Sequence, residues 1–422
     1  MRDMFAPVTR DERQAESVQK WLSSKGKGTI VACTGYGKTR VAINCIERVL
    51  AKYPTLTVLV VVPTDTLLKQ WVSILDDRGL SLNTKVQIIN TTAKNGYECD
   101  ILVIDEIHRV GADTFKEVFN KVKYKHILGL TATIERLDGK HEIIEKHCPV
   151  IDEISIEVAR VSGWVSDFVE YQVIISPEDI DLYRQYNKEF TEHFGYFNYD
   201  FGLVQSMLGP NGFINRAKYR DEICQDESKR KEVFKAITYH STGAMRALQS
   251  RKKYIYNHPQ KLEVARKIIE ARSDKKIITF SANVKMAESM GIGYVYTGKE
   301  GKKKNRMTIE EFSKLEKGVL NSCQLANEGL DCSGLSVGIV MGLDSSPIKS
   351  TQRTGRVIRK EGNKFAEMFT LVLENTVEQE WFKKSHPNGN YITIDVANLE
   401  KVLRGEPYEP YKKKLQNFTY RF

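Results

Sequence analysis

The segment Ala-Cys-Thr-Gly-Tyr-Gly-Lys-Thr at residues 32–39 carries the residue types that bind a nucleoside triphosphate. Gly35 and Gly37 give the backbone the freedom to curl its N–H groups around a phosphate. Lys38 can supply positive charge to the β- and γ-phosphate oxygens, and the hydroxyl of Thr39 can ligate Mg²⁺. A chance glycine-rich turn beside a lysine is the alternative. The residues expected to contact ATP here are Thr34, Gly35, Tyr36, Gly37, Lys38, Thr39 and Arg40.

Two carboxylates follow a second apolar run. Residues 101–104 (Ile-Leu-Val-Ile) lead directly into Asp105 and Glu106. The carboxyl ends of neighbouring parallel strands meet at one edge of a sheet, so Asp105 can reach a Mg²⁺ ion held by Thr39. Glu106 can then position or deprotonate the attacking water. A solvated acidic turn at the end of a strand is the alternative.

Three arginines stand three residues apart near the end of the chain. Arg353, Arg356 and Arg359 would share one face of a helix, and no acidic residue lies between them. Such crowded guanidinium groups favour an external anion. A γ-phosphate across a cleft fits, with Arg356 and Arg359 as arginine fingers. A solvated basic helix, or one that faces nucleic acid, is the alternative.

Strands that alternate with helices would position these groups. Strands that are apolar at every position are typical of a parallel sheet covered on both faces. Apolar, β-branched runs occur at residues 29–32, 57–62, 101–104, 126–130, 276–280, 294–296, 319–320, 337–341 and 368–373. Residues 39–52 have the spacing of a helix, whereas 177–257 lack strand-like runs and mix aromatic with charged residues.

This pattern predicts an α/β protein built from two lobes. We expect an ATP-binding lobe at residues 1–165 and a second lobe at 258–390. Between them we expect a mainly helical insertion or linker at 166–257, with a possible DNA contact. Residues 391–422 are expected to form a C-terminal tail.

Composition narrows the class of protein. The chain has 422 residues, of which 41% are hydrophobic and 28% charged, as in an ordinary soluble globular protein. The net charge of +10 favours a polyanionic partner. Seven scattered cysteines never form a C-x-x-C pair, which excludes a zinc ribbon and argues against a disulfide scaffold. The sequence has no signal core and no apolar run of about 20 residues, so we expect a cytoplasmic protein (in the host cytoplasm if viral) with no membrane partner. The sequence gives no signal for an oligomer, so we expect a monomer.

Ala-x-x-Gly-x-Gly-Lys-Thr followed by Asp-Glu-x-His resembles motifs I and II of superfamily 2 helicases in the DExH subgroup. Further segments resemble the family's other motifs in order: 62–71 motif Ia, 131–133 motif III, 277–280 motif IV, 327–331 motif V and 352–359 motif VI. Residues 134–139 are most similar to the group that contains the xeroderma-pigmentosum group B repair helicase and phage branch-migration helicases.

The resemblance implies two RecA-like parallel-sheet lobes that hydrolyse ATP with Mg²⁺ between them. It implies that Gln14 reads adenine, although Arg13 replaces the family's usual aromatic residue, and a glutamine on an ordinary polar helix is the alternative. Gly329 and Asp331 of motif V would also bind the nucleotide. The catalytic residues would be Lys38, Asp105, Glu106, Gln352, Arg356 and Arg359. The residues that contact nucleic acid or couple it to hydrolysis would be Pro63, Thr64, Gln70, Thr131, Thr133, Ser281 and Arg353.

The insertion is the part of the chain with the strongest basic character. Residues 216–253 hold eleven basic and five acidic side chains, with interleaved tyrosines and a phenylalanine. Such a segment could grip a phosphate backbone and stack bases. A solvated helical surface with core aromatics is the alternative.

These features predict an ATP-dependent DNA helicase or translocase that acts on forked or branched DNA. The alternatives are an RNA helicase of the same superfamily, a DNA-stimulated ATPase that does not separate strands, and a passive nucleic-acid-binding module.

Overall fold

The computed structural model describes residues 8–111, 116–134, 139, 141–323, 332–387 and 389–411. Gly329 and Asp331, residues 135–138 and the lysines at 412–414 lie outside this part of the chain, so the expectations for them remain predictions. In the described ranges, no helix combines the length and the apolar character that a bilayer crossing requires.

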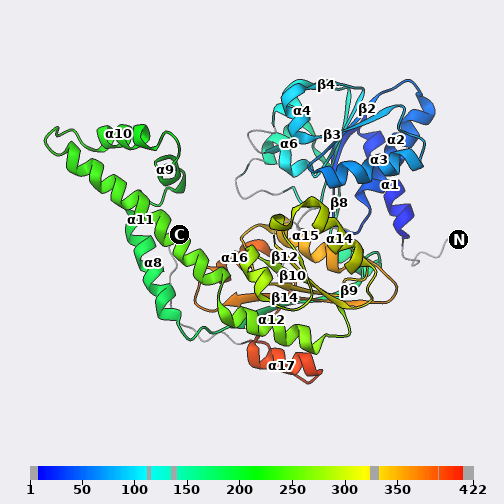
Figure 1. The fold of residues 1–422 in the computed structure, drawn as a ribbon. Helices are drawn as coiled ribbons and strands as arrows, with labels where there is room; N and C mark the ends of the chain where they lie inside the picture. Colours follow the sequence, from blue (N-terminus) through cyan, green and yellow to red (C-terminus); the bar gives the residue numbers. More distant parts are fainter. Residues whose placement is uncertain are drawn as a thin grey trace.

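Lobe 1 is a parallel sheet with the strand order β3-β2-β5-β7-β1-β8 (Figure 1). The strands β2 and β5 are buried at every position because helices cover both faces of the sheet, as their continuous apolar character predicts. The elements of lobe 1 are α1 (Arg10–Ser23), β1 (Lys27–Ala32), α2 (Lys38–Lys52), β2 (Val58–Val62), α3 (Asp65–Asp77), β3 (Thr84–Ile88), α4 (Ile89–Asn95), β4 (Tyr97–Glu98), β5 (Ile101–Asp105), η1 (Ile107–Gly111), α5 (Glu117–Lys121), β6 (Val122–Lys123), β7 (His126–Thr131), α6 (His141–His147), β8 (Val150–Ile154) and α7 (Ile156–Val161).

Lobe 2 is a second parallel sheet, with the order β11-β12-β10-β13-β14-β9-β15. It lies below lobe 1 in Figure 1, and α15 occupies the side that faces lobe 1. Its elements are β9 (Asp167–Ile175), α12 (Pro259–Ala271), β10 (Lys276–Ser281), α13 (Val284–Ser289), β11 (Tyr294–Tyr296), η2 (Gly298–Glu300), α14 (Gly301–Ser313), β12 (Gly318–Cys323), β13 (Val337–Val340), α15 (Pro347–Val357), β14 (Phe365–Leu373), α16 (Glu378–Ser385), β15 (Ile392–Asp395) and α17 (Val396–Arg404).

A helical arm, residues 176–257, projects from lobe 2 (Figure 1). It consists of α8 (Ile180–Gly195), α9 (Phe201–Ser206), α10 (Gly212–Ile223) and α11 (Arg230–Tyr256). Phe190 and Phe194 of α8 share a separate hydrophobic core with Ile237 and Ala244 of α11. The far part of the arm therefore has a core of its own, whereas Tyr183 of α8 and Ile255 of α11 pack in the core of lobe 2.

The expected fold class, two RecA-like lobes with helices between them, is confirmed. The sheet of lobe 2 nevertheless takes strands from outside residues 258–390. β9 lies within the segment 166–257 and pairs in parallel with β14 along its whole length. β15 lies within 391–422 and pairs with the other edge of β9. β9 mixes polar residues such as Glu170 and Gln172 with apolar ones, and β15 has only four residues, so neither has the long apolar run of a central strand. The partners of both strands are distant in the sequence.

The expectation that three arginines share one helical face is wrong for Arg359. α15 ends at Val357, so Arg359 lies beyond it. The carbonyl of Ile358 accepts a hydrogen bond from the backbone N–H of Ser166, at 2.8 Å, and Arg359 forms a bridge with Val165. The backbone that follows α15 thus pairs with the linker between the lobes (residues 162–166) instead of continuing the helix.

Candidate functional site

The phosphate loop lies between β1 and α2, at the carboxyl edge of the lobe 1 sheet. Gly35 and Gly37 both adopt left-handed backbone conformations, with φ of +92° and +94°. These angles are costly for residues that carry a Cβ, which explains both glycines. Lys38 opens α2 and donates from Nζ to the carbonyl of Ala32 at 2.9 Å, so its ammonium group lies over the loop.

Gln14 of α1 supports the loop from the side. Its Nε2 donates to the carbonyl of Tyr36 at 2.7 Å, and a Cβ at Gly37 would lie 2.6 Å from that nitrogen. Its Oε1 is buried and accepts no hydrogen bond from the residues that the structure describes. A buried acceptor beside the phosphate loop fits a residue that meets the base of a nucleotide.

Arg13 stands where the family usually has an aromatic residue, and it forms a structural ion pair. Its guanidinium forms a bidentate ion pair with Asp152, at 2.8 and 2.6 Å. Lys20 approaches the same carboxylate at 2.5 Å. This cluster fastens α1 to β8 and so holds Gln14 at the loop.

The two carboxylates lie at the end of β5 in different surroundings. Burial raises the pKa of Asp105 to about 6, and the neighbouring charge of Glu106 acts in the same direction. The indole Nε1 of Trp71, in α3, donates to Asp105 Oδ2 at 2.9 Å and partly opposes this rise. Sequence reasoning missed Trp71, because nothing local in the amphipathic helix α3 shows which residue its buried indole meets.

Glu106 turns away from Asp105 in an unusual backbone conformation, with φ of +53°. Burial alone would raise the pKa of Glu106, but the contact with His108 and the charge of Lys38 lower it. Nδ1 of His108 lies 3.3 Å from Glu106 Oε2 and 3.0 Å from Thr131 Oγ1. Since the Thr131 hydroxyl donates to the carbonyl of Thr133 at 2.6 Å, it accepts from His108. Glu106 is thereby linked to the end of β7.

The phosphate loop carries helix α15 of lobe 2 directly on its surface. A Cβ added to Gly355 would lie 2.1 Å from the Cβ of Thr34, so no side chain fits between the helix and the loop. Val165, in the linker, packs on the other side of the loop, 3.3 Å from a Cβ at Gly35. Gly355 and Val165 therefore bring both lobes to one surface, a contact that the sequence did not reveal.

The three arginines Arg353, Arg356 and Arg359 differ in their exposure and in their surroundings. Arg356 is buried in the last turn of α15, while Arg359 is partly exposed beyond it, and Gln352 is partly exposed within the helix. Arg353 is 5% exposed and lies over the ring of Phe280, at 5.7 Å.

The residues expected to contact nucleic acid or to couple it to hydrolysis fall into two groups. Pro63, Thr64, Gln70 and Thr133 are partly exposed, and Thr64 also caps α3 through the N–H of Leu67 at 3.3 Å. Ser281, Arg353 and Thr131 are buried. Arg40 is exposed and pairs with Asp11 at 3.1 Å. Of the residues expected to contact nucleic acid or to couple it to hydrolysis, the first group therefore has side chains that reach the surface.

Potential metal ligands are dispersed in the part of the chain that the structure describes. There, no cluster of three or more His, Cys, Asp or Glu side chains could hold a metal ion. All seven cysteines are buried and free of disulfides.

Comparisons with known proteins agree with this geometry. Residues 8–96 and 80–136 match the family "Type III restriction enzyme, res subunit", and residues 260–361 match "Helicase conserved C-terminal domain". The chain is 26% identical over 388 residues to the DNA 3'-5' translocase XPB2 of Sulfurisphaera tokodaii, covering 86% of this chain and 82% of that protein. It is 31% identical over 179 residues to the putative ATP-dependent RNA helicase QP509L of African swine fever virus, covering 36% of this chain and 34% of that protein.

A solved structure shows the same fold. Dbp5 of S. cerevisiae, bound to RNA and ADP BeF3, superposes with a TM-score of 0.57 at 12% identity, over 93% of this chain and 92% of that one. The two matched family models and the relative XPB2 imply a nucleic-acid-dependent ATPase, and the two RecA-like lobes that meet over the phosphate loop agree with that class. The chain belongs to the superfamily 2 helicases and translocases.

We expect Trp71→Phe to lower ATP turnover about tenfold while ATP binding stays near the wild-type level, because the indole orients Asp105. Steady-state ATPase rates and titration with a fluorescent nucleotide measure the two effects. Trp21→Phe is the matched control, since Trp21 is equally buried and its Nε1 donates to the backbone carbonyl of Ile127 at 3.0 Å. Equal losses in both variants would assign Trp71 a purely structural part.

We expect Gly355→Ala to lower kcat/KM for ATP about a hundredfold, because the methyl group must push α15 off Thr34. Small-angle scattering should show a larger radius of gyration. Gly209→Ala, where the nearest atom to a Cβ is 3.9 Å away, is the control and should behave like wild type. Unchanged turnover in Gly355→Ala would mean that hydrolysis does not use this contact.

Proposed function

We propose that the protein is an ATP-dependent DNA translocase or helicase that remodels forked or branched DNA. The observation that supports this most directly is the seating of α15 from lobe 2 on the phosphate loop of lobe 1. Opening and closing of that contact would convert ATP binding and hydrolysis into relative movement of the lobes.

The proposed nucleotide site uses Lys38 and the N–H groups of the loop for the phosphates, and Gln14 for the base. Thr39 and Asp105 would hold Mg²⁺. The raised pKa of Asp105 fits such a site, because burial of the carboxylate outweighs the opposing charge of Lys38, and a bound cation would stabilise the ionised form. When bound, Mg²⁺ would neutralise charge on the phosphate oxygens.

Glu106 is the proposed general base for the attacking water. Its lowered pKa keeps it ionised and able to accept a proton at neutral pH. His108 and Thr131 would carry the state of this carboxylate to the end of β7. Arg356 and Arg359 are the proposed arginine fingers, with Gln352 beside them and Gly329 and Asp331 of the predicted motif V on the nucleotide.

DNA is favoured as the polymer by the relative XPB2, which is named as a DNA translocase and matches 86% of this chain at 26% identity. The arm is the proposed contact for a branched substrate. Its helix α10 lies at the end of the arm away from lobe 2 (Figure 1). Phe213 of α10 is 68% exposed, and the guanidinium of Arg216 lies 5.8 Å from the ring of Phe234. Such a surface suits phosphate contacts together with base stacking.

The second candidate is an RNA helicase. It is favoured by the African swine fever virus relative, which is named as a putative RNA helicase. A DNA-stimulated ATPase without strand separation remains the third, since phosphate contacts alone support sliding.

ATP turnover should be measured without polymer and with single-stranded DNA, duplex DNA, forked DNA and RNA, alongside strand displacement on the fork. We expect the strongest stimulation by forked DNA. Lys38→Ala and Glu106→Gln should each lower stimulated turnover at least about a hundredfold. Turnover that is equal with and without every polymer would contradict a motor, and stimulation by RNA alone would establish the second candidate.

We expect Arg356→Ala to bind ATP normally and to hydrolyse it about a thousandfold more slowly, because the finger stabilises charge that develops in the transition state. Single-turnover hydrolysis and nucleotide binding separate the two. Lys360→Ala removes an exposed positive charge close by and is the control. Weaker ATP binding with normal turnover at saturation would contradict this role.

A further inference from the structure

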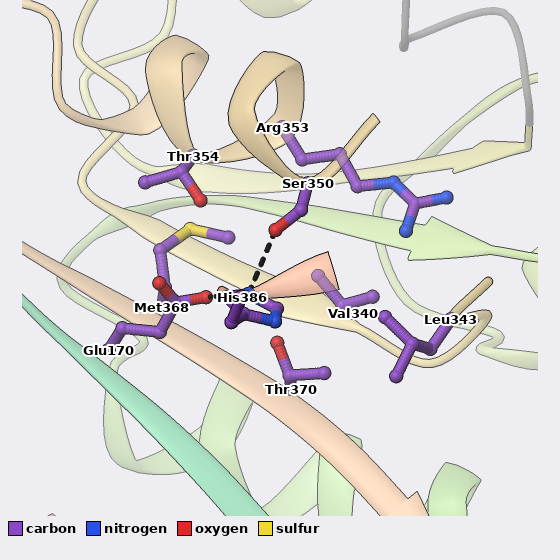
Figure 2. Close-up of a pocket in the computed structure, with 9 residues that line it drawn as sticks. All are labelled: Glu170, Val340, Leu343, Ser350, Arg353, Thr354, Met368, Thr370 and His386. Atoms are coloured by element: carbon purple, nitrogen blue, oxygen red, sulfur yellow. Dashed lines mark hydrogen bonds and ion pairs between the residues drawn. The ribbon is translucent and has the colours of Figure 1, made fainter. Parts of the chain in front are cut away.

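A closely packed pocket lies behind α15, inside lobe 2 (Figure 2). Its walls come from β9, α15, β14 and the end of α16, and it leaves no room for a ligand. Glu170, Ser350, Arg353 and His386 supply its polar groups. None of the proposed steps of ATP hydrolysis uses Glu170, Ser350 or His386.

His386 stands at the centre of these contacts. Nε2 lies 2.9 Å from Glu170 Oε1 of β9 and 2.8 Å from Ser350 Oγ of α15. Nδ1 lies 2.9 Å from the carbonyl of Phe382 in α16. A carbonyl only accepts, so Nδ1 carries a proton, and an ionised carboxylate only accepts, so Nε2 carries one as well. The single N–H of Nε2 is then shared between Glu170 Oε1 and Ser350 Oγ, which both accept from it. The geometry is that of an imidazolium.

The surroundings favour the charged ring. Burial by itself would lower the pKa of His386, but the hydrogen bond and the charge of Glu170, together with the Phe382 carbonyl, raise it above its usual value. Arg353 of α15 opposes this rise. The ring of Tyr391 stands edge-on at 6.0 Å, and Phe382 stacks on the imidazole at 4.1 Å.

Two of the elements joined by this ring, β9 and α15, are connected to different parts of the molecule. β9 follows the interlobe linker, where Ser166 bonds to the carbonyls of Ile358 and Arg359, and it leads into the arm. α15 carries Gly355, on the phosphate loop, and Arg356. Figure 2 shows the imidazole of His386 below Ser350 of α15 and close to Glu170.

We propose that His386 is a positioning residue, whose imidazolium ties α15 to β9 and thereby aligns the arginines of α15 with the phosphate loop. The tie rests on the proposed role of Arg356, which it refines. Without the proton on Nε2, the ring nitrogen and the Glu170 carboxylate become two acceptors that face each other, and β9 loses its hold on α15.

This arrangement fixes the direction of a pH effect. Since the pKa of His386 is raised, the tie is complete at pH values below its ordinary value and is lost as pH rises through the folded-state pKa. Turnover of ATP should therefore fall in the wild-type protein as pH rises above the ordinary pKa of histidine. The fall should be in kcat, because the arginines act on transition-state charge and not on ground-state binding.

Two serines provide a matched pair of variants. Ser350 and Ser385 both place a hydroxyl within 2.9 Å of the His386 ring, but Ser385 belongs to α16 and its hydroxyl donates to Phe382 within the same helix. We expect Ser350→Ala to lower DNA-stimulated kcat about tenfold, to leave KM for ATP within about twofold, and to flatten the alkaline limb. Ser385→Ala should keep the wild-type kcat and pH profile.

His386→Gln and Glu170→Gln test the other two ends of the tie in the full-length chain. Each should flatten the alkaline limb, and an imidazole NMR titration should place the pKa of His386 above that of a free histidine in wild type but not in Glu170→Gln. Thermal unfolding of each variant identifies any that fail to fold, and the NMR titration of wild type does not depend on them.

Arg356→Ala, measured in parallel, separates failure of the tie from failure of the proposed function. Loss of turnover in Arg356→Ala with a wild-type profile in Ser350→Ala would overturn the tie alone. Normal turnover in Arg356→Ala would overturn the finger role on which the tie rests. Identical behaviour of the two serine variants would also overturn the tie.

Discussion

The contact between α15 and the phosphate loop is the constraint on which the arrangement of the molecule depends. Gly355 and Thr34 come so close that a single methyl group would not fit between them. The linker reinforces this contact, because Ser166 bonds to the backbone that follows α15. A phosphate bound at the loop would therefore lie next to both lobes. A change in the conformation of the loop would displace α15.

Two adjacent carboxylates acquire opposite properties from their surroundings. Asp105 is the last residue of β5 and is buried against the indole of Trp71, and its pKa is raised. Glu106 turns through a left-handed backbone conformation to His108, and its pKa is lowered. Separation of the pKa values of neighbouring groups suits the proposed roles of Asp105 as a cation ligand and Glu106 as a base. The turn at Glu106 contributes to this separation because it places the carboxylate beside His108.

β9 connects the interlobe linker, the sheet of lobe 2 and the arm. It begins at the linker, lies between β14 and β15 in the sheet, and ends at the root of the arm. At that root, Asp179 accepts hydrogen bonds from Tyr254 at 2.8 Å and His258 at 2.9 Å. The arm is in this way fixed to lobe 2 at both of its ends. Movement of lobe 2 over the phosphate loop would carry the arm with it.

The sequence by itself determined the parts that depend on neighbouring residues. The apolar runs of β2 and β5, the glycines of the phosphate loop and the pair Asp105-Glu106 are local patterns, and each lies where its pattern predicts. The tertiary structure alone decided that Trp71 meets Asp105, that Gly355 meets Thr34, and that His386 meets Glu170 across 216 residues. β9 was likewise hidden, because Glu170 and Gln172 interrupt its apolar residues and its partners β14 and β15 are distant in the sequence. Periodicity and composition report what a residue's neighbours in the chain require, whereas contacts between distant segments arise only when the sheets have formed and packed.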